Sequence, residues 1–260
     1  PALLCERGGA LAQEGNLELA YQFFGRAVTN APNDPHVLAM YAEFLAGSLG
    51  DVEEAKKVLE SCVQCGGRGQ VYFSLGQVQT GMDAVQSFRA GIEQLEHDPQ
   101  NNEIIASAYC RICEVFMTDL CFEENAEQIC VTCATKAVEL SVGGGRVEAL
   151  HCWASVLISQ QKTTEAKAEI LKAFAILQDL EDDDEIIEVA DVVEYEMRLN
   201  VSKVLIEVGC GSEASIVLEA LLLESDADIE VWYCCGLAYR QQELYAEALP
   251  YLETAATMLQ

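Results

Sequence analysis

A pattern of large and small residues recurs about every 34 residues along this chain, and it constrains the fold more than any other feature. The last segment, residues 229–260, reads IEVWYCCGLAYRQQELYAEALPYLETAATMLQ. Small residues such as Gly236 and Ala248 alternate there with large ones at helical spacing. Two antiparallel helices approach closely only where small residues of one meet large residues of the other. The pattern therefore predicts a helix–turn–helix unit. The residues at the pattern-defining positions of this unit are Trp232, Cys235, Gly236, Tyr239, Ala248, Leu252 and Ala255.

The same template fits six further ranges upstream, with small changes of spacing. The second range needs one extra residue in its turn, and the third is about four residues shorter. One helix pair cannot bury its apolar face alone, so stacked repeats share a continuous core. We expect one all-α domain over 1–260, a right-handed α-solenoid of about seven repeats. The predicted repeats are 1–34, 35–69, 70–100, 101–140, 147–180, 185–228 and 229–260.

This order of large, small and aromatic positions resembles the tetratricopeptide repeat (TPR) family over nearly the whole chain. The resemblance implies a groove lined by the first helix of each repeat, in which extended peptides bind. Members that bind C-terminal carboxylates require Lys and Asn at the fifth and ninth positions of their first repeat. Those positions hold Cys5 and Gly9 here, so the sequence predicts a different ligand.

The charge of the chain narrows the choice of partner. Forty-three acidic residues against 15 basic ones leave a net charge of −28. Nucleic acids and anionic membranes are bound through Lys and Arg, so we expect neither as a direct partner. A hydrophobic fraction of 51% also excludes a disordered acidic chain. We therefore expect a soluble protein with a positively charged protein partner.

Carboxylates interleaved with apolar groups occupy the predicted groove positions. Such an arrangement suits an extended Lys/Arg-rich segment, because it offers charge-assisted hydrogen bonds and steers association. The candidate client-binding residues at these positions are Glu43, Glu148, His151, Glu196, Glu207, Glu230 and Tyr233.

An acidic segment, residues 179–196, contains ten acids and no base. Its Asp182, Asp183 and Asp184 can cap a helix N-terminus and complement the helix dipole. They can equally form a clamp for client Lys and Arg side chains, and both roles can hold together. The apolar periodicity predicts one long helix from about residue 185 to residue 208.

Twelve cysteines include three CxxC pairs: Cys62/Cys65, Cys110/Cys113 and Cys130/Cys133. The last two pairs formally fit the spacing of a four-cysteine zinc site. Cys130 and Cys133 nevertheless fall at helix packing positions, where a reduced cysteine behaves as a small hydrophobe. We expect reduced core thiols, an intracellular protein and no metal. The chain also carries no phosphate-binding, dinucleotide-binding or nucleophile-elbow motif, so we expect no cofactor and no catalytic residue.

Within the TPR family, the chain resembles the dedicated acidic assembly chaperones of large-subunit ribosomal protein four. The resemblance rests on the acidic charge, on EIIEVADVVEYEMRLNVSKVLIEVG, and on the closing EVWYCCGLAYRQQ. It implies a non-enzymatic protein, cytoplasmic and nuclear, that holds a basic segment of that ribosomal protein until assembly. We expect a monomer before the client binds. A general chaperone of histones and basic proteins, or a scaffold subunit of a larger TPR complex, remain alternatives.

Overall fold

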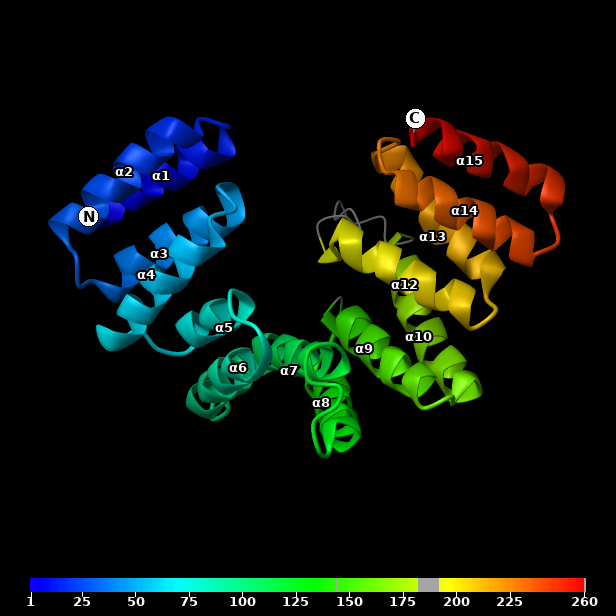
Figure 1. The fold of residues 1–260 in the computed structure, drawn as a ribbon, viewed down its shortest axis with the longest axis horizontal. Coiled ribbons are helices and arrows are strands. Elements are labelled where there is room, and N and C mark those ends of the chain that lie inside the picture. The colour runs from blue at the N-terminus through cyan, green and yellow to red at the C-terminus, as the bar shows by residue number, and fades with distance from the viewer. Residues whose placement is uncertain (144, 182–191, 260) are drawn as a thin grey trace. The chain divides into compact units, whose positions relative to one another are not determined.

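The computed structural model describes residues 1–143, 145–181 and 192–259, and every regular element in these ranges is helical (Figure 1). The all-α prediction is confirmed. None of the helices in these ranges is both long enough and apolar enough to cross a membrane. The α-helices are α1 (Ala2–Gln13), α2 (Leu17–Asn30), α3 (Pro35–Glu43), α4 (Val52–Gln64), α5 (Gln70–Gln77), α6 (Gly81–Leu95), α7 (Asn102–Met117), α8 (Ala126–Leu140), α9 (Gly145–Ser159), α10 (Thr163–Glu181), α12 (Tyr195–Glu207), α13 (Gly211–Glu224), α14 (Ile229–Gln241) and α15 (Tyr245–Met258).

The helices form two compact units, residues 1–127 and residues 128–260. Within the first unit α1 packs on α2, α3 on α4 and α5 on α6. Within the second unit α9 packs on α10, α12 on α13 and α14 on α15. Five of these pairs lie within one predicted repeat range, and α9 and α10 extend beyond the range 147–180 by two residues and one residue. Helix–turn–helix units of this kind bury their apolar faces against each other.

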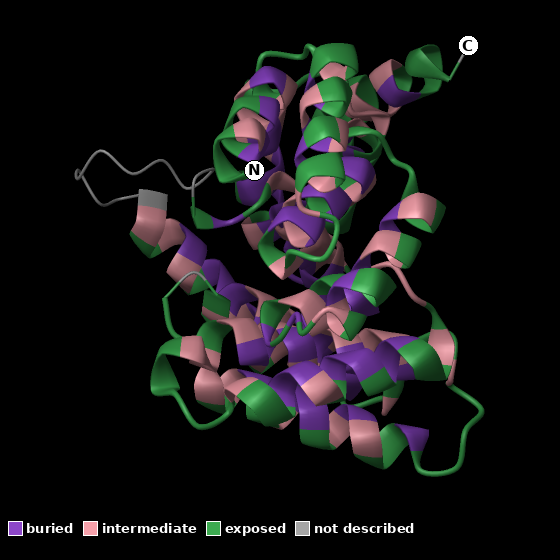
Figure 2. Cartoon of the chain, turned by 90° about the vertical axis from the view of Figure 1, so that its left-hand side faces the viewer, coloured by how far each residue is buried: buried purple, intermediate pink, exposed green. Residues whose placement is uncertain are grey.

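Small residues let the paired helices approach, as the repeat pattern predicts. A Cβ added to Gly8 of α1 would lie 2.9 Å from ring carbons of Phe24 in α2. A Cβ added to Gly236 of α14 would lie 2.4 Å from Leu252 Cδ2 in α15. Phe24 is 2% exposed. Buried and exposed residues alternate along the helices, as amphipathic packing requires (Figure 2).

The extra residue predicted in the second repeat is accommodated by a π-helical turn. After α3 the chain continues as a π-helix, Phe44–Ser48, and the Leu49 N–H donates to the Phe44 carbonyl over 3.2 Å. Gly50 then takes a φ of +67°, in the left-handed region that glycine adopts without strain. Phe44 stays 4% exposed, and its ring stacks on Phe24 with centroids 4.7 Å apart. The insertion therefore widens one helical turn and leaves the core intact.

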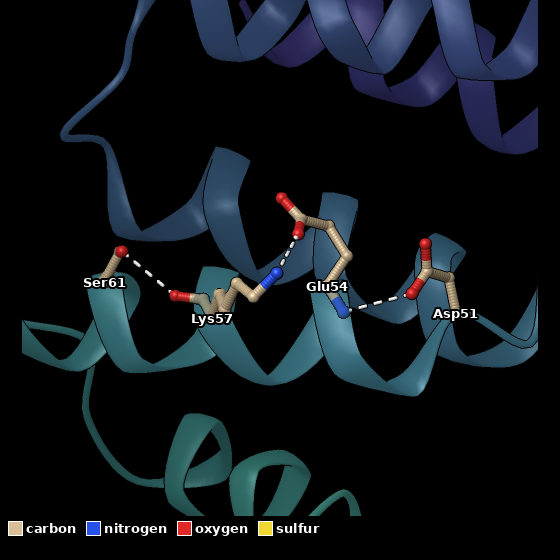
Figure 3. Close-up of polar contacts among 4 residues, drawn as sticks. All are labelled: Asp51, Glu54, Lys57 and Ser61. Carbon is tan, nitrogen blue, oxygen red and sulfur yellow. Dashed lines mark hydrogen bonds and ion pairs between the residues drawn. The ribbon is translucent and has the colours of Figure 1, made fainter.

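Side-chain caps begin several helices, and α4 shows the arrangement (Figure 3). The Asp51 carboxylate accepts a hydrogen bond of 3.1 Å from the Glu54 N–H, one of the donors that a helix start leaves without an intrahelical partner. One turn further, Lys57 Nζ donates to Glu54 Oε2 over 2.9 Å. Acidic side chains here complement the positive end of the helix dipole.

The acidic segment is divided differently from the prediction. Its first residues, 179–181, complete α10, and α12 begins only at Tyr195. Glu194 has an extended ψ of 146°, and Val193 before it is buried in the core of the second unit. The prediction of one continuous helix over 185–208 is therefore wrong at Val193–Glu194. Asp182, Asp183 and Asp184 lie outside the described residues.

Candidate functional site

The candidate client-binding residues of the second unit gather on α12 and α14. Glu196 and Glu207 are exposed on α12, and Glu230 and Tyr233 are exposed on α14, with Tyr233 51% accessible. The two helices are first helices of successive repeats, and they pack against each other (Figure 1). We call these four residues the client face.

An internal ion pair joins the two helices of the client face. Lys203 Nζ of α12 lies 2.8 Å from Glu230 Oε1 of α14, and it also donates to Asn200 Oδ1 over 3.3 Å. The Lys203 side chain is 33% exposed and that of Glu230 is 52% exposed. Any cationic group of a ligand would therefore have to compete with Lys203 for the Glu230 carboxylate.

The client face is less acidic than the composition of its unit. The second unit holds 24 Asp and Glu residues against eight Lys and Arg residues. Helices α12 and α14, however, hold three acidic residues and three basic ones, the latter being Arg198, Lys203 and Arg240. Arg240 lies in the last turn of α14, where a cation complements the helix dipole. The greater part of the negative charge of the unit is therefore carried elsewhere.

Two further contacts set the position of α12. Arg198 is 3% exposed. Its guanidinium forms a bidentate ion pair with the carboxylate of Glu224, the last residue of α13, and its Nη2 lies 2.7 Å from Glu224 Oε2. Gln241 of α14 donates to the Ile206 carbonyl of α12 over 2.8 Å. A buried guanidinium requires such a paired geometry, because an unpaired buried charge is strongly destabilising. These contacts hold α12 against its neighbours.

The remaining predicted residues lie in other surroundings. Glu148 and His151 are half-buried on α9, which contacts α12. Glu43 is the last residue of α3 in the first unit, and it lines a hollow of about 620 Å³. Phe73 contributes apolar lining to that hollow, and Arg111 supplies a cation.

The hollow in the first unit is balanced in charge. Glu43 is the acid and Arg111 the base among its lining residues, and Arg111 also pairs with Glu114 over 2.9 Å. The sequence pattern assigns Glu43 of α3 to an acidic groove but does not point to Gln70 or Arg111, which lie two and four helices further along the chain, on α5 and α7. Only the fold brings these side chains around one hollow.

The cysteines lie mainly in the core. Ten of the twelve are buried, Cys65 is half-buried and Cys121 is exposed, and all twelve are free thiols. Burial raises the pKa of Cys62, and it raises the pKa of Cys235 to about 12. These thiols stay protonated at neutral pH and act as packing groups. Among the described residues, no group of three or more His, Cys, Asp or Glu side chains could hold a metal ion.

The helix pairs with small residues at their contacts define a protein of the tetratricopeptide-repeat α-solenoid class. A solved tetratricopeptide repeat protein from Parabacteroides merdae shares this fold, with a TM-score of 0.57 and 14% identity over 99% of this chain and 92% of that one. No model of a known protein family matches the chain. The solenoid prediction is confirmed.

The comparisons with higher sequence identity are with proteins named assembly chaperones. The chain is 31% identical over 211 residues to the Schizosaccharomyces pombe protein named "Probable assembly chaperone of rpl4", covering 76% of this chain and 60% of that one. An Emericella nidulans protein of the same name is 29% identical over 91% of this chain and 63% of its own length. The solved structure of the assembly chaperone of RpL4 (Acl4) has a TM-score of 0.77 and 26% identity, covering 95% of this chain and 98% of that one.

The chain is therefore a homologue of the assembly chaperones of rpl4, and the resemblance noted from its sequence is confirmed. It spans about three-fifths of the length of these two curated relatives.

Proposed function

We propose that this protein is a non-enzymatic assembly chaperone of the ribosomal protein rpl4. It binds a basic, extended segment of the newly made protein on its client face and protects that segment until incorporation into pre-ribosomes. The observation that carries this proposal is the homology to proteins named assembly chaperones of rpl4, which extends over 91% of the chain for one of them. The α-solenoid fold and the net charge of −28 support it.

The chemistry of the client face suits Lys and Arg side chains. Within the described ranges Glu196 and Glu207 form no ion pair, so their carboxylates can accept charge-assisted hydrogen bonds from a client directly. The exposed Tyr233 ring offers an apolar and π-rich surface for an Arg guanidinium or a Lys stem. Glu230 becomes available when the client displaces Lys203.

The proposal also includes where the protein acts and in what state. Ribosomal proteins are made in the cytoplasm and join pre-ribosomes in the nucleus, so the chaperone works in both compartments. It is a monomer before the client binds, because copies of such an acidic chain repel one another. The client is its basic partner, and it contacts neither nucleic acid nor membrane directly.

The experiment reverses the charge of the client face. The triple variant Glu196→Lys, Glu207→Lys and Glu230→Lys should weaken rpl4 binding by about tenfold or more, since each exposed pair contributes up to about 1 kcal/mol. The matched control reverses Glu139, Glu165 and Glu247, which are exposed on the second helices α8, α10 and α15. Both variants change the net charge equally, so only the position of the charge differs.

Isothermal titration of purified rpl4 into each protein measures the affinities at physiological ionic strength. Equal losses of rpl4 affinity in the two variants would mean that overall charge alone governs binding, which would contradict the assignment of the client face. Core histones serve as competitors in the same titration. If histones bind as tightly as rpl4, the protein is a general chaperone of basic proteins instead.

A further inference from the structure

The carboxylate of Glu230 at the start of α14 is already engaged by a lysine of the protein itself. Lys203 Nζ on α12 lies 2.8 Å from Glu230 Oε1 and donates to Asn200 Oδ1 over 3.3 Å. Both charged side chains of this ion pair stay partly exposed. A pair exposed to this degree is weak enough to exchange for a pair with another cation. Which cation can replace Lys203 therefore depends on what that cation offers beyond a single pair.

An incoming lysine would gain no net attraction from Glu230. Its ammonium would form the same kind of single pair that Lys203 already makes, so one pair is lost for each pair formed. The hydrogen bond from Lys203 to Asn200 would be lost as well. Lys203 also belongs to the folded chain, so its pairing requires no loss of translational and rotational freedom, whereas that of a ligand does. The exchange of one lysine for another is therefore unfavourable.

An incoming arginine brings two contacts that Lys203 does not make. Its planar guanidinium presents parallel N–H donors that can engage both oxygens of one carboxylate. A guanidinium also stacks on aromatic rings. Tyr233 follows Glu230 by three positions on α14, so the two side chains are neighbours on one face of the helix, and the Tyr233 ring is exposed. One arginine can therefore pair with the Glu230 carboxylate and lie against the Tyr233 ring at once.

We propose that Glu230 and Tyr233 form a subsite for arginine rather than lysine, with Lys203 as the internal competitor that excludes lysine. This inference rests on the client face proposed above and specifies its ligand, an extended segment with an arginine opposite the first turns of α14. Glu196 and Glu207, for which the described part of the chain shows no ion pair, accept either cation. Selectivity is therefore confined to the α14 end of the client face.

The probes are two synthetic peptides of equal length and charge. One carries arginine as its only cation and the other carries lysine, and Gly and Ser separate the cations in both. Fluorescence anisotropy at physiological ionic strength measures the two affinities. We expect the parent protein to bind the arginine peptide about fivefold more tightly than the lysine peptide, which corresponds to one stacking contact at an exposed site.

A charge-neutral double variant locates the preference. Lys203→Met with Glu230→Gln removes the subsite and its internal competitor together, so the net charge is unchanged. Binding of the arginine peptide should weaken about fivefold. Binding of the lysine peptide should change by less than about twofold, because that peptide gains nothing from Glu230 in the parent protein. The matched control, Lys172→Met with Glu169→Gln, removes an ion pair of 2.8 Å on α10 and should leave both affinities unchanged.

Two single variants separate the roles within the subsite. Tyr233→Leu keeps an apolar side chain but removes the ring, so it should weaken binding of the arginine peptide alone. Lys203→Met leaves the Glu230 carboxylate unpaired, and it should strengthen binding of the lysine peptide by about threefold or more, since no internal lysine then competes. Lys172→Met changes the net charge equally and should have a smaller effect.

An arginine preference that persists in the double variant would place the selectivity elsewhere on the protein and overturn the subsite. Equal weakening of both peptides in that variant would show that Glu230 binds either cation, and failure of the parent protein to bind either peptide would also contradict the proposal. Titration of rpl4 in the same buffer keeps the two proposals apart. Binding of rpl4 without discrimination between the peptides removes the arginine subsite alone, whereas discrimination without rpl4 binding removes the proposed client alone.

Discussion

At the scale of single residues, Glu219 joins three helices of the second unit through one carboxylate oxygen. Its Oε1 accepts hydrogen bonds from the hydroxyls of Tyr239 on α14 and of Tyr251 on α15, the latter over 3.2 Å. The two tyrosine rings stack with centroids 5.3 Å apart. The hydrogen bond to Glu219, followed by burial, raises the pKa of Tyr239 above its usual value. A shared acceptor of this kind fixes the relative rotation of α13, α14 and α15.

Tyr239→Phe should lower the free energy of unfolding by about 1 kcal/mol at pH 8, because it removes a hydrogen bond to a charged group. The folded pKa of Tyr239 lies above the unfolded value of about 10. The stabilisation by the Tyr239 hydrogen bond is therefore fully present below pH 10 and declines as the pH rises above that value. Urea denaturation at pH 8 and pH 11 measures both effects. If the difference in unfolding free energy between the parent protein and Tyr239→Phe were the same at pH 8 and pH 11, the hydrogen bond from Tyr239 to Glu219 would not make this contribution. Tyr233→Phe, which alters an exposed tyrosine, is the control.

Cys235 and Cys121 should differ sharply in their reactivity towards iodoacetamide. Cys235 is fully buried and its pKa is raised to about 12, chiefly by burial, whereas Cys121 is exposed. The thiolate is the reactive form, and at pH 8 a thiol with a pKa of about 12 remains almost entirely protonated. Mass spectrometry of peptides after timed labelling should show Cys121 modified first and Cys235 only in denaturant. Similar labelling rates in the native protein would refute this expectation.

At the scale of helices, close contacts depend on glycines whose surroundings differ. Gly91 in α6 leaves no room, because an added Cβ would lie 2.4 Å from a ring carbon of Phe73. Phe73 is 5% exposed and held in the core. Gly25 in α2 has nothing within 4 Å of an added Cβ. Replacing glycine by alanine should therefore have opposite effects on stability at these two positions.

Gly91→Ala should destabilise the protein by about 1–3 kcal/mol, since a rigid aromatic ring must shift. Gly25→Ala should stabilise it by about 0.5–1 kcal/mol, because alanine has the higher helix propensity and meets open space. Chemical denaturation of both variants beside the parent protein gives the two values. If Gly91→Ala were as stable as Gly25→Ala, the ring contact would be looser than the structure indicates.

The helices also show how far the sequence could be interpreted. The spacing of Gly8, Gly236 and Ala248 predicted the helix pairs, because one repeated pattern records the same packing contact many times. The break at Val193–Glu194 was missed, since the apolar periodicity continues across it while the backbone does not. The pairs Lys203–Glu230 and Arg198–Glu224 were also missed, because each joins residues more than 25 positions apart whose proximity depends on how repeats stack. No local sequence pattern shows which residues of consecutive repeats come together when the repeats stack.

At the scale of the whole molecule, the net charge of −28 acts on folding and on binding in opposite ways. Like charges within the folded chain repel one another and destabilise the compact state, and dissolved salt weakens that repulsion. The same charge would attract the basic client proposed above, and salt would weaken that attraction as well. Stability and client affinity should therefore respond to ionic strength with opposite signs.

Raising sodium chloride from about 10 mM to about 150 mM shortens the Debye length from about 30 Å to about 8 Å. We expect the thermal midpoint to rise by about 2–4 °C, which corresponds to roughly 1 kcal/mol in a chain of this size. The affinity for rpl4 should fall over the same range. Differential scanning calorimetry and titration of the same samples measure both quantities. A thermal midpoint that falls with salt would mean that the acidic residues are held mainly by favourable pairs, such as Lys203–Glu230, so that self-repulsion is not the dominant electrostatic effect.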